Sequence, residues 1–498
     1  MDFIDSNQEH LNPTEEISLD VVKSRAVKGV AVLTGRTFFL SIISLLATGL
    51  LTVFLSPSEF GVFWIVSAVV NFLAYFSDIG LAAALIQKKE KISNEDLRTT
   101  FTIQQILVIT LLIILFLLTP VITRFYSLSS EGKFLLFALG FSLLLSSLKT
   151  VPSVLLEREL NFPKLVLPQI LENLVYNILA VTLAWQGFGI RSFTYAVLVR
   201  GMVGLTAIYI IRPWRPGFAF SKNSLKRLLT FGIPYQLNSF LATIKDDGMT
   251  VFLGGLLGAS GVGLLGWAQK WAYTPLRLFM DHVLKVTFPA FSRMQDEKEQ
   301  LKRSVTHSIF FVCFLVFPLT TGLVIISPLL VDIIPRYGKW EPALTPLLFI
   351  SINTLFAAAT TQLTNLLNAI GRIKTTFKLM VMWTVLTWIL VPLLARYYGV
   401  NGAAFAYALI GISSIIAIYI SHKAVEFSLY EAVFKPALGS LIMGLVLIFI
   451  KSILAINLTS ILILVGLGVV LYTISMYLIT GSSIIIDAKK VISGIFKG

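Results

Sequence analysis

One apolar segment of the chain, residues 261–288, carries four charged side chains. They are separated by seven, four and four residues, which places them on one face of a helix: Lys270, Arg277, Asp281 and Lys285. The segment is long enough to cross a bilayer, where an ionisable side chain costs at least roughly 2.5–3.5 kcal/mol unless it meets water, a partner or a substrate. We therefore expect this face to line a polar interior.

Other apolar segments carry charged side chains as well, and bases outnumber acids among them. Arg36 lies in the first segment and Arg200 in the sixth. The planar guanidinium group matches the oxygens of a phosphate, so an excess of buried arginine favours an anionic ligand. Four residues are predicted to bind such an anionic group: Arg36, Arg200, Lys270 and Arg277.

A purely structural role is the alternative for part of this set. Arg277 with Asp281, and Asp281 with Lys285, have the i,i+4 spacing of ion pairs within one helix. Acidic residues and their neighbouring bases in the membrane segments have two interpretations, coupling to a cation or structural pairing. These residues are Asp78, Lys245, Asp246, Asp247, Asp281 and Lys285.

No motif in the sequence supports catalysis, metal binding or nucleotide binding. The stretch GVGLLG at residues 261–266 fits G-x-G-x-x-G, but it lies where a turn enters an apolar helix, with no βαβ strand before it. The four histidines lack ligand spacing, and the single cysteine, Cys313, lies in an apolar run. We expect no enzyme activity, no catalytic residue, no metal and no cofactor.

The elements that must position these residues are about fourteen apolar segments of near twenty residues, each the length of a membrane-spanning helix. They are expected at 29–55, 59–84, 99–122, 132–154, 165–186, 188–211, 228–253, 261–288, 304–330, 343–368, 374–396, 400–422, 433–455 and 458–480. The mean hydropathy of +0.84 agrees with an all-α polytopic membrane protein.

Basic residues in the connecting loops lie on alternate sides. With a cytoplasmic N-terminus, 26 of the 40 Lys and Arg residues fall in inside loops and tails, and only 7 fall outside. This is the positive-inside pattern, and it predicts that both termini are cytoplasmic. The net charge of +14 is then explained by a basic surface beside anionic membrane lipids, and no nucleic acid partner is expected.

The chain contains an internal repeat. LSPSEFGVFW, from Leu55, aligns with LGASGVGLLG, from Leu257, and GIRSFTYA, from Gly189, aligns with GVNGAAFA, from Gly399. An even number of helices separates these segments, so the halves are parallel repeats, with substrate sites expected between lobes. The predicted domains are a cytoplasmic tail 1–27, an N-lobe 28–211 of helices 1–6, a cytoplasmic linker 212–227, a C-lobe 228–422 of helices 7–12, helices 13–14 at 433–480, and a cytoplasmic tail 481–498.

Three stretches of sequence resemble a known family. They are LSPSEFGVFWIVSAVVNFLAYFSDIGLAAALIQ, the loop PSVLLERELNFPKL, and GLLGWAQKWAYTPLRLFMDHVLKVTFPAFSRMQDEKEQLKR. They look like Wzx-type polysaccharide and O-antigen flippases of the multidrug/oligosaccharidyl-lipid/polysaccharide (MOP) exporter superfamily, over roughly residues 20–425. The resemblance implies a multi-pass protein of the bacterial inner membrane that carries polyprenyl-diphosphate-linked oligosaccharide between leaflets by alternating access, for lipopolysaccharide or exopolysaccharide biosynthesis.

The resemblance also implies partners, and it leaves alternatives. A polysaccharide polymerase, a chain-length regulator and a coupling cation would accompany such a flippase. A flippase for lipid-linked peptidoglycan precursors would share the cationic cavity, so charge does not separate it. A cation-coupled multidrug exporter of the same fold would need an acidic cavity, which the excess of bases argues against. A membrane glycosyltransferase or polymerase would need catalytic carboxylates on a large loop, and no loop here exceeds about 20 residues.

Overall fold

The computed structural model describes residues 19–88 and 90–481, and these residues form helices without any strand. Contacts divide the chain into two compact units, residues up to 259 and residues from 260 onward. The first unit contains α1 (Leu19–Phe54), α2 (Pro57–Ala74), α3 (Leu81–Gln87), α4 (Asn94–Phe125), α5 (Ser130–Leu148), α6 (Thr150–Arg158), α7 (Phe162–Trp185), α8 (Arg191–Ile211), α9 (Lys222–Thr243) and the π-helical turn η1 (Ile244–Gly248).

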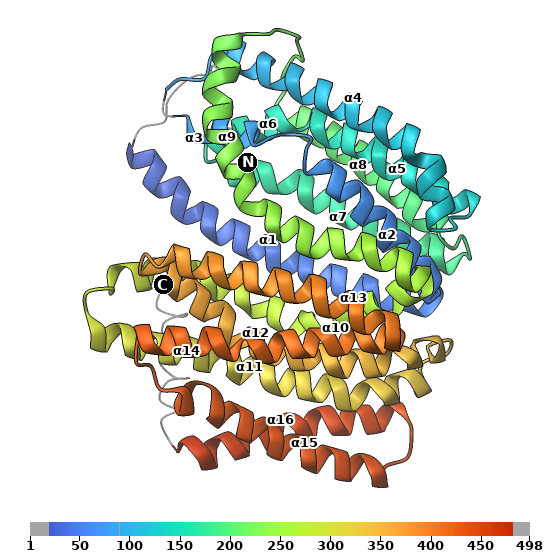
Figure 1. Cartoon of the computed structure of the whole chain (residues 1–498), viewed down its shortest axis with the longest axis vertical. Helices are drawn as coiled ribbons and strands as arrows, with labels where there is room; N and C mark the ends of the chain where they lie inside the picture. The colour runs from blue at the N-terminus through green and yellow to red at the C-terminus, as the bar shows by residue number, and fades with distance from the viewer. Residues whose placement is uncertain (1–18, 89, 482–498) are drawn as a thin grey trace, which may run out of the picture. The chain divides into compact units, whose positions relative to one another are not determined.

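Helix α10 (Met249–Arg293) begins in the first unit and continues into the second. The second unit then contains α11 (Lys298–Ile333), η2 (Gly338–Ala343), α12 (Leu344–Ala369), α13 (Ile373–Ser413), α14 (Ile415–Ala424), η3 (Tyr430–Phe434), α15 (Lys435–Ile453) and α16 (Leu458–Thr480). Within each unit, neighbouring helices pack side by side, as α7 packs on α8 and α15 on α16 (Figure 1).

Twelve helical stretches in the described residues are long and apolar enough to cross a membrane. Two of them, Phe240–Arg293 and Ile373–Ala424, have 54 and 52 residues, about 80 Å of helix against a hydrocarbon core of about 30 Å. Each is interrupted by a glycine with non-helical backbone, Gly258 (φ 67°) and Gly399 (φ 60°). Each stretch therefore supplies two spans, and the prediction of about fourteen spans is confirmed.

Sequence signals explain where several helices begin. Ser56 and Glu59 form a reciprocal capping box at the start of α2, with Pro57 in the first turn. Ser93 and Asp96 form the same arrangement at the start of α4. These contacts satisfy backbone N–H groups that would otherwise lack partners at a helix N-terminus.

The second predicted span, 59–84, is broken in the structure. Helix α2 ends at Ala74 and α3 begins at Leu81, after a turn in which Gly80 has φ 73°. The turn packs against α9: a Cβ on Gly80 would lie 2.3 Å from the carbonyl oxygen of Gly232. Tyr75 donates its hydroxyl to the Gln236 carbonyl, and the Gln236 amide donates to the Tyr75 carbonyl at 2.6 Å. A side chain of α9 thus satisfies a backbone carbonyl next to the break.

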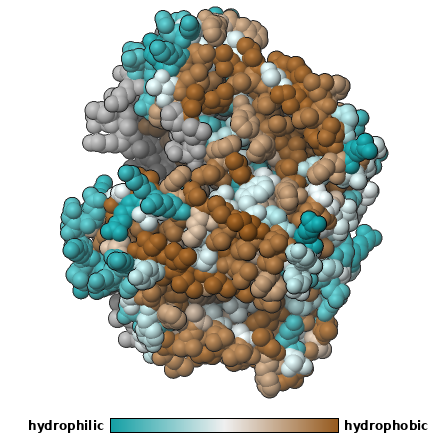
Figure 2. All heavy atoms as spheres, in the orientation of Figure 1, coloured by the Kyte–Doolittle hydropathy of each residue, from teal (hydrophilic) through white to brown (hydrophobic). Residues whose placement is uncertain are grey.

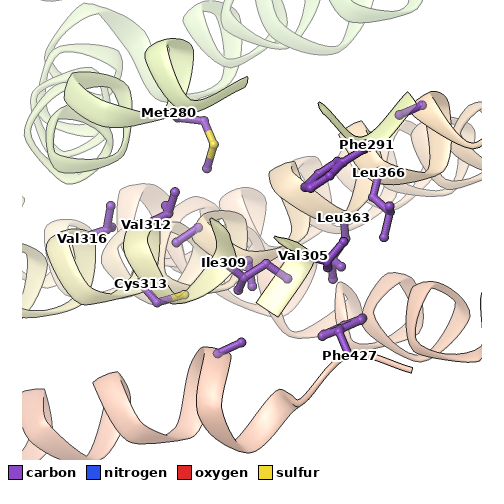
Figure 3. Packing of buried hydrophobic residues seen from close by; sticks show 14 of the residues in the cluster. Met280, Phe291, Val305, Ile309, Val312, Cys313, Val316, Leu363, Leu366 and Phe427 are labelled. Carbon is purple, nitrogen blue, oxygen red and sulfur yellow. The ribbon is translucent and has the colours of Figure 1, made fainter. Parts of the chain in front are cut away.

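A buried cluster of apolar side chains holds the second unit together. Met280 and Phe291 of α10 pack with Ile309 and Val312 of α11 and Leu363 of α12 (Figure 3). All five side chains are buried. Because α10 turns this apolar face inward, its charged residues must lie on another face of the helix.

Outward-facing side chains are largely apolar, as lipid requires. Figure 2 shows hydrophobic side chains along the sides of the helices and hydrophilic ones near the helix ends, on the face in view. Leu445, Phe449 and Leu462 of the last two spans are each more than half exposed. Because this exposed apolar surface belongs to helices that are long enough to cross a bilayer, the chain is a multi-pass membrane protein.

The internal repeat has a local structural counterpart. Gly189 and Gly399, which the repeat aligns, both have a left-handed backbone, with φ of 57° and 60°. Positive φ therefore recurs at matching positions in the two halves, where glycine avoids its steric cost. The domain boundaries expected from the repeat stay a prediction, and the contact-based boundary lies after α9, between residues 259 and 260.

Candidate functional site

A polar cavity of about 500 Å³ lies within the first unit, among α1, α3, the α5–α6 junction, α7 and α8. Its charged lining consists of three bases and two acids: Arg36, Lys149, Arg200, Glu157 and Glu172. Uncharged polar side chains from the same helices complete the lining, among them Gln169, Asn173, Ser146 and Ser153. The cavity can therefore hold a hydrated or ionic group that the surrounding apolar segments would exclude.

Glu172, on α7, joins two of the bases. Its Oε1 lies 2.6 Å from Lys149 Nζ, and its Oε2 lies 3.6 Å from Arg200 Nε. Lys149 lies at the junction where α5 ends and α6 begins, and Arg200 also lies over the ring of Tyr176, at 5.7 Å. The carboxylate thus neutralises charge on two neighbouring helices while only 11% of its side chain is exposed.

Arg36, on α1, has a different environment. Its Nε is buried and has no hydrogen-bond partner among the described residues. No carboxylate oxygen in that part of the chain lies within 4.0 Å of its guanidinium group. A buried donor without an acceptor is costly unless a ligand or water satisfies it, so Arg36 is the base in this cavity that is free to receive an anion.

Glu157 completes the charged lining at the end of α6. The side chain is half-buried, and no described base lies within 4.0 Å of it. Burial raises the pKa of this carboxyl above its ordinary value. With Glu157 ionised the cavity carries one net positive charge, and with Glu157 protonated it carries two.

The second basic group predicted from the sequence lies on α10, in the second unit. Lys270, Arg277, Asp281 and Lys285 are all exposed there, on the side away from Met280 and Phe291. The i,i+4 ion pairs considered as an alternative are not formed: within the described residues, none of these bases lies within 4.0 Å of a carboxylate oxygen. The face therefore has three unpaired bases and, with Asp281, a formal net charge of +2.

The acidic candidates in the first unit have local partners. Both carboxylate oxygens of Asp78 accept from the Ala82 amide, at 3.3 and 3.2 Å, at the start of α3. Lys245 and Asp246 form an ion pair at 3.2 Å, and Asn71 of α2 hydrogen-bonds Asp247. These contacts are the structural pairing that was one of the two interpretations, and ion coupling at the same residues stays a prediction.

The cavity of the first unit contains two of the four predicted phosphate-binding residues, Arg36 and Arg200, and the other two lie on α10 in the second unit. The sequence prediction missed the role of three lining residues, Lys149, Glu157 and Glu172. Lys149 and Glu172 were visible as charges inside apolar segments. Their pairing joins segments 23 residues apart, and no helical period reveals such a contact.

Known proteins resemble this chain along much of its length. A family model described as "Polysaccharide biosynthesis protein" matches residues 50–345. The succinoglycan biosynthesis transport protein ExoT of Rhizobium meliloti is 27% identical over 270 residues, 54% of each chain. The lipopolysaccharide biosynthesis protein WzxC of Escherichia coli is 24% identical over 385 residues, 77% of this chain and 75% of WzxC. The chain thus spans about half the length of ExoT and three quarters of WzxC.

A solved structure gives the fold. The lipid II flippase MurJ, in an inward closed conformation, matches with a TM-score of 0.76 over 91% of this chain and 100% of the MurJ chain. Sequence identity is 19%, so this likeness shows the fold alone. The resemblance to Wzx-type proteins that the sequence phrases indicated is confirmed by the match to WzxC. Because the family model covers more than half of the sequence, the chain belongs to the polysaccharide biosynthesis protein family.

Proposed function

We propose that this protein is a flippase that moves polyprenyl-diphosphate-linked oligosaccharide units across the bacterial inner membrane for surface polysaccharide biosynthesis. The observation that carries the proposal is the cavity with an excess of bases, above all Arg36, whose buried Nε has no partner in the described structure. Its chemistry suits phosphate oxygens. The names of ExoT and WzxC, a transport protein and a lipopolysaccharide biosynthesis protein, support the same function.

Electrostatics explains why such a protein is needed. A diphosphate does not cross about 30 Å of hydrocarbon unaided, because the cost of removing its hydration is large. The cationic residues would replace that hydration while alternating access moves the headgroup, and the polyprenyl tail would remain in lipid. We assign diphosphate binding to Arg36 and Arg200 of the first unit and to Lys270 and Arg277 of the second. The protein itself would catalyse no reaction.

Net transport in one direction requires an additional source of free energy. Affinities that differ between inward and outward states give net transport only when a gradient or consumption of the product biases the cycle. We propose a coupling cation, with Asp247 as its first candidate ligand, and consumption by a polysaccharide polymerase with a chain-length regulator. The positive-inside pattern supports cytoplasmic termini.

The charge of the cavity argues against one of the two alternative functions but not against the other. A multidrug exporter for organic cations would need an acidic cavity, whereas three bases face two acids here. A flippase for lipid-linked peptidoglycan precursors would need the same bases, and charge does not distinguish it. The match to a polysaccharide biosynthesis family, together with relatives in succinoglycan and lipopolysaccharide biosynthesis, favours the polysaccharide substrate.

Removal of the unpaired guanidinium group tests the proposal. In a strain that lacks the gene, Arg36→Ala at native expression should abolish surface polysaccharide and leave lipid-linked oligosaccharide in the membrane fraction, because the diphosphate loses its contact. Arg277→Ala should have the same effect, because Arg277 belongs to the basic group on α10 to which we also assign diphosphate binding.

Arg191→Ala is the matched control for these variants. Arg191 is half exposed and pairs with Glu131 at 3.0 Å outside the cavity, so its loss should leave export intact. Normal surface polysaccharide in the Arg36→Ala strain, with the variant present in the membrane, would refute the assignment of Arg36.

A further inference from the structure

Glu172 lies where a ligand phosphate is expected. It accepts from Lys149 at 2.6 Å and approaches Arg200 at 3.6 Å, so two of the three bases in the cavity already share one carboxylate. Only Arg36 lacks an acceptor among the described side chains. The carboxylate thus resembles a resident anion in the site rather than a surface charge.

The backbone of α8 accommodates this carboxylate. A Cβ on Gly204 would lie 1.7 Å from Glu172 Oε1, so the absence of a side chain leaves the space that the carboxylate occupies. Gly204 lies four residues after Arg200, on the same face of α8. The position of Glu172 between Lys149 and Arg200 is therefore defined by a close helix approach as well as by charge.

The affinity of the cavity for an anion depends on whether the anion binds a base without an acceptor or the bases that already contact Glu172. An anion that contacts Arg36 alone displaces nothing. An anion that also takes Lys149 and Arg200 must compete with a charged acceptor that is always present, so its apparent affinity is lowered by that competition. A ligand with two phosphate groups offers enough negative charge to replace Glu172, whereas a single phosphate offers less.

We propose that Glu172 is an internal counter-anion that the diphosphate displaces from Lys149 and Arg200, and that this exchange selects diphosphates over monophosphates and keeps binding weak enough for release. The inference rests on the proposed function, because it concerns the same cavity. It gives Glu172 a specificity-determining role, since selection depends on which anions can compete with the carboxylate.

Binding of inorganic pyrophosphate and inorganic phosphate to the purified full-length protein in nanodiscs tests this role. The Glu172→Gln variant removes the competing charge at nearly constant volume. It should bind pyrophosphate about tenfold more tightly than the wild type and phosphate more tightly by a larger factor, so that the preference for pyrophosphate narrows. The double variant Lys149→Met/Glu172→Gln should lose most of that gain, because the released base is absent.

Glu131→Gln is the matched control. Glu131 also pairs with an arginine in the first unit, Arg191, but outside the cavity, so neither affinity nor preference should change. Should Glu172→Gln fail to fold, Glu172→Asp keeps the charge and withdraws it from Lys149, and a smaller gain in pyrophosphate affinity is expected. A folded variant of either kind with unchanged or weaker pyrophosphate binding would overturn the proposal.

Export measurements separate this inference from the function on which it rests. Glu172→Gln should reduce surface polysaccharide despite tighter binding, because release becomes slow. If deletion of the gene leaves surface polysaccharide unchanged, the transported cargo is wrong, while the change in pyrophosphate preference still reports on Glu172. If deletion abolishes polysaccharide but the preference stays as in the wild type, Glu172 is structural and the flippase function stands.

Discussion

We expect Glu157 to make the attraction of the cavity for an anion depend on pH. Its half-buried carboxyl has a raised pKa, so it takes up a proton at higher pH than an ordinary glutamate. Protonation removes a negative charge from a cavity that also contains Arg36, Lys149, Arg200 and Glu172. Anion affinity should therefore rise as the pH falls through this raised pKa.

Glu157→Gln tests that dependence on pH. Above the pKa the variant should bind pyrophosphate more tightly than the wild type, by about tenfold for one charge at close range. The ratio of the two affinities should approach one as the pH is lowered, because the wild-type carboxyl becomes neutral. Using the ratio cancels the titration of pyrophosphate itself, and a ratio that stays constant as the pH is lowered until the wild-type carboxyl is protonated would contradict the role of Glu157.

At the residue scale, sequence and structure each contribute a different part of the site. The cost of burying charge was enough to single out Arg36 and Arg200, which line the cavity. The same cost does not indicate which bases are paired with a carboxylate, because that pairing depends on contacts between helices. Lys149 and Glu172 meet only when α7 packs against the α5–α6 junction.

At the scale of elements, the sequence predicts the number of spans but not the place where a helix is interrupted. Hydrophobic length predicted fourteen spans, and the structure has them, because apolar length is a local property of the sequence. The break after α2 was not predicted. Its cause is a contact with α9, 150 residues further along the chain, where Gly80 meets the backbone of Gly232.

A glycine substitution tests the break directly. Gly80→Ala should destabilise the protein by about 2–4 kcal/mol, because φ is positive there and the new Cβ meets the Gly232 carbonyl, a backbone group that has no room to move. Gly187→Ala is the control, since its φ is 85° but nothing lies within 4 Å of its Cβ. Thermal unfolding in detergent should give a lower Tm for Gly80→Ala than for Gly187→Ala, and equal values would mean that the contact with α9 adds nothing.

At the scale of the whole molecule, charge determines orientation. The basic residues that make the chain +14 are concentrated in loops that the alternation of spans assigns to one side. Translocating a cluster of Lys and Arg across the membrane is unfavourable, so we expect the side that carries them to stay in the cytoplasm. This follows from the sequence alone, since it requires only the order of spans and loops, whereas the pairing of individual charges requires the folded structure.

Cysteine labelling tests this orientation in both units. Cys313 is buried and is the only cysteine, so Cys313→Ser gives a background without reactive thiols. A membrane-impermeant maleimide applied to sealed right-side-out vesicles should label new cysteines at Ser130, the first residue of α5, and at Glu341 in η2, which are exposed and lie between spans on the side expected outside. Cysteines at Glu95 and Asp296, equally exposed but expected inside, should react only after the vesicles are permeabilised. The opposite pattern in both units would show that the topology is inverted and would refute the orientation expected from the basic loops.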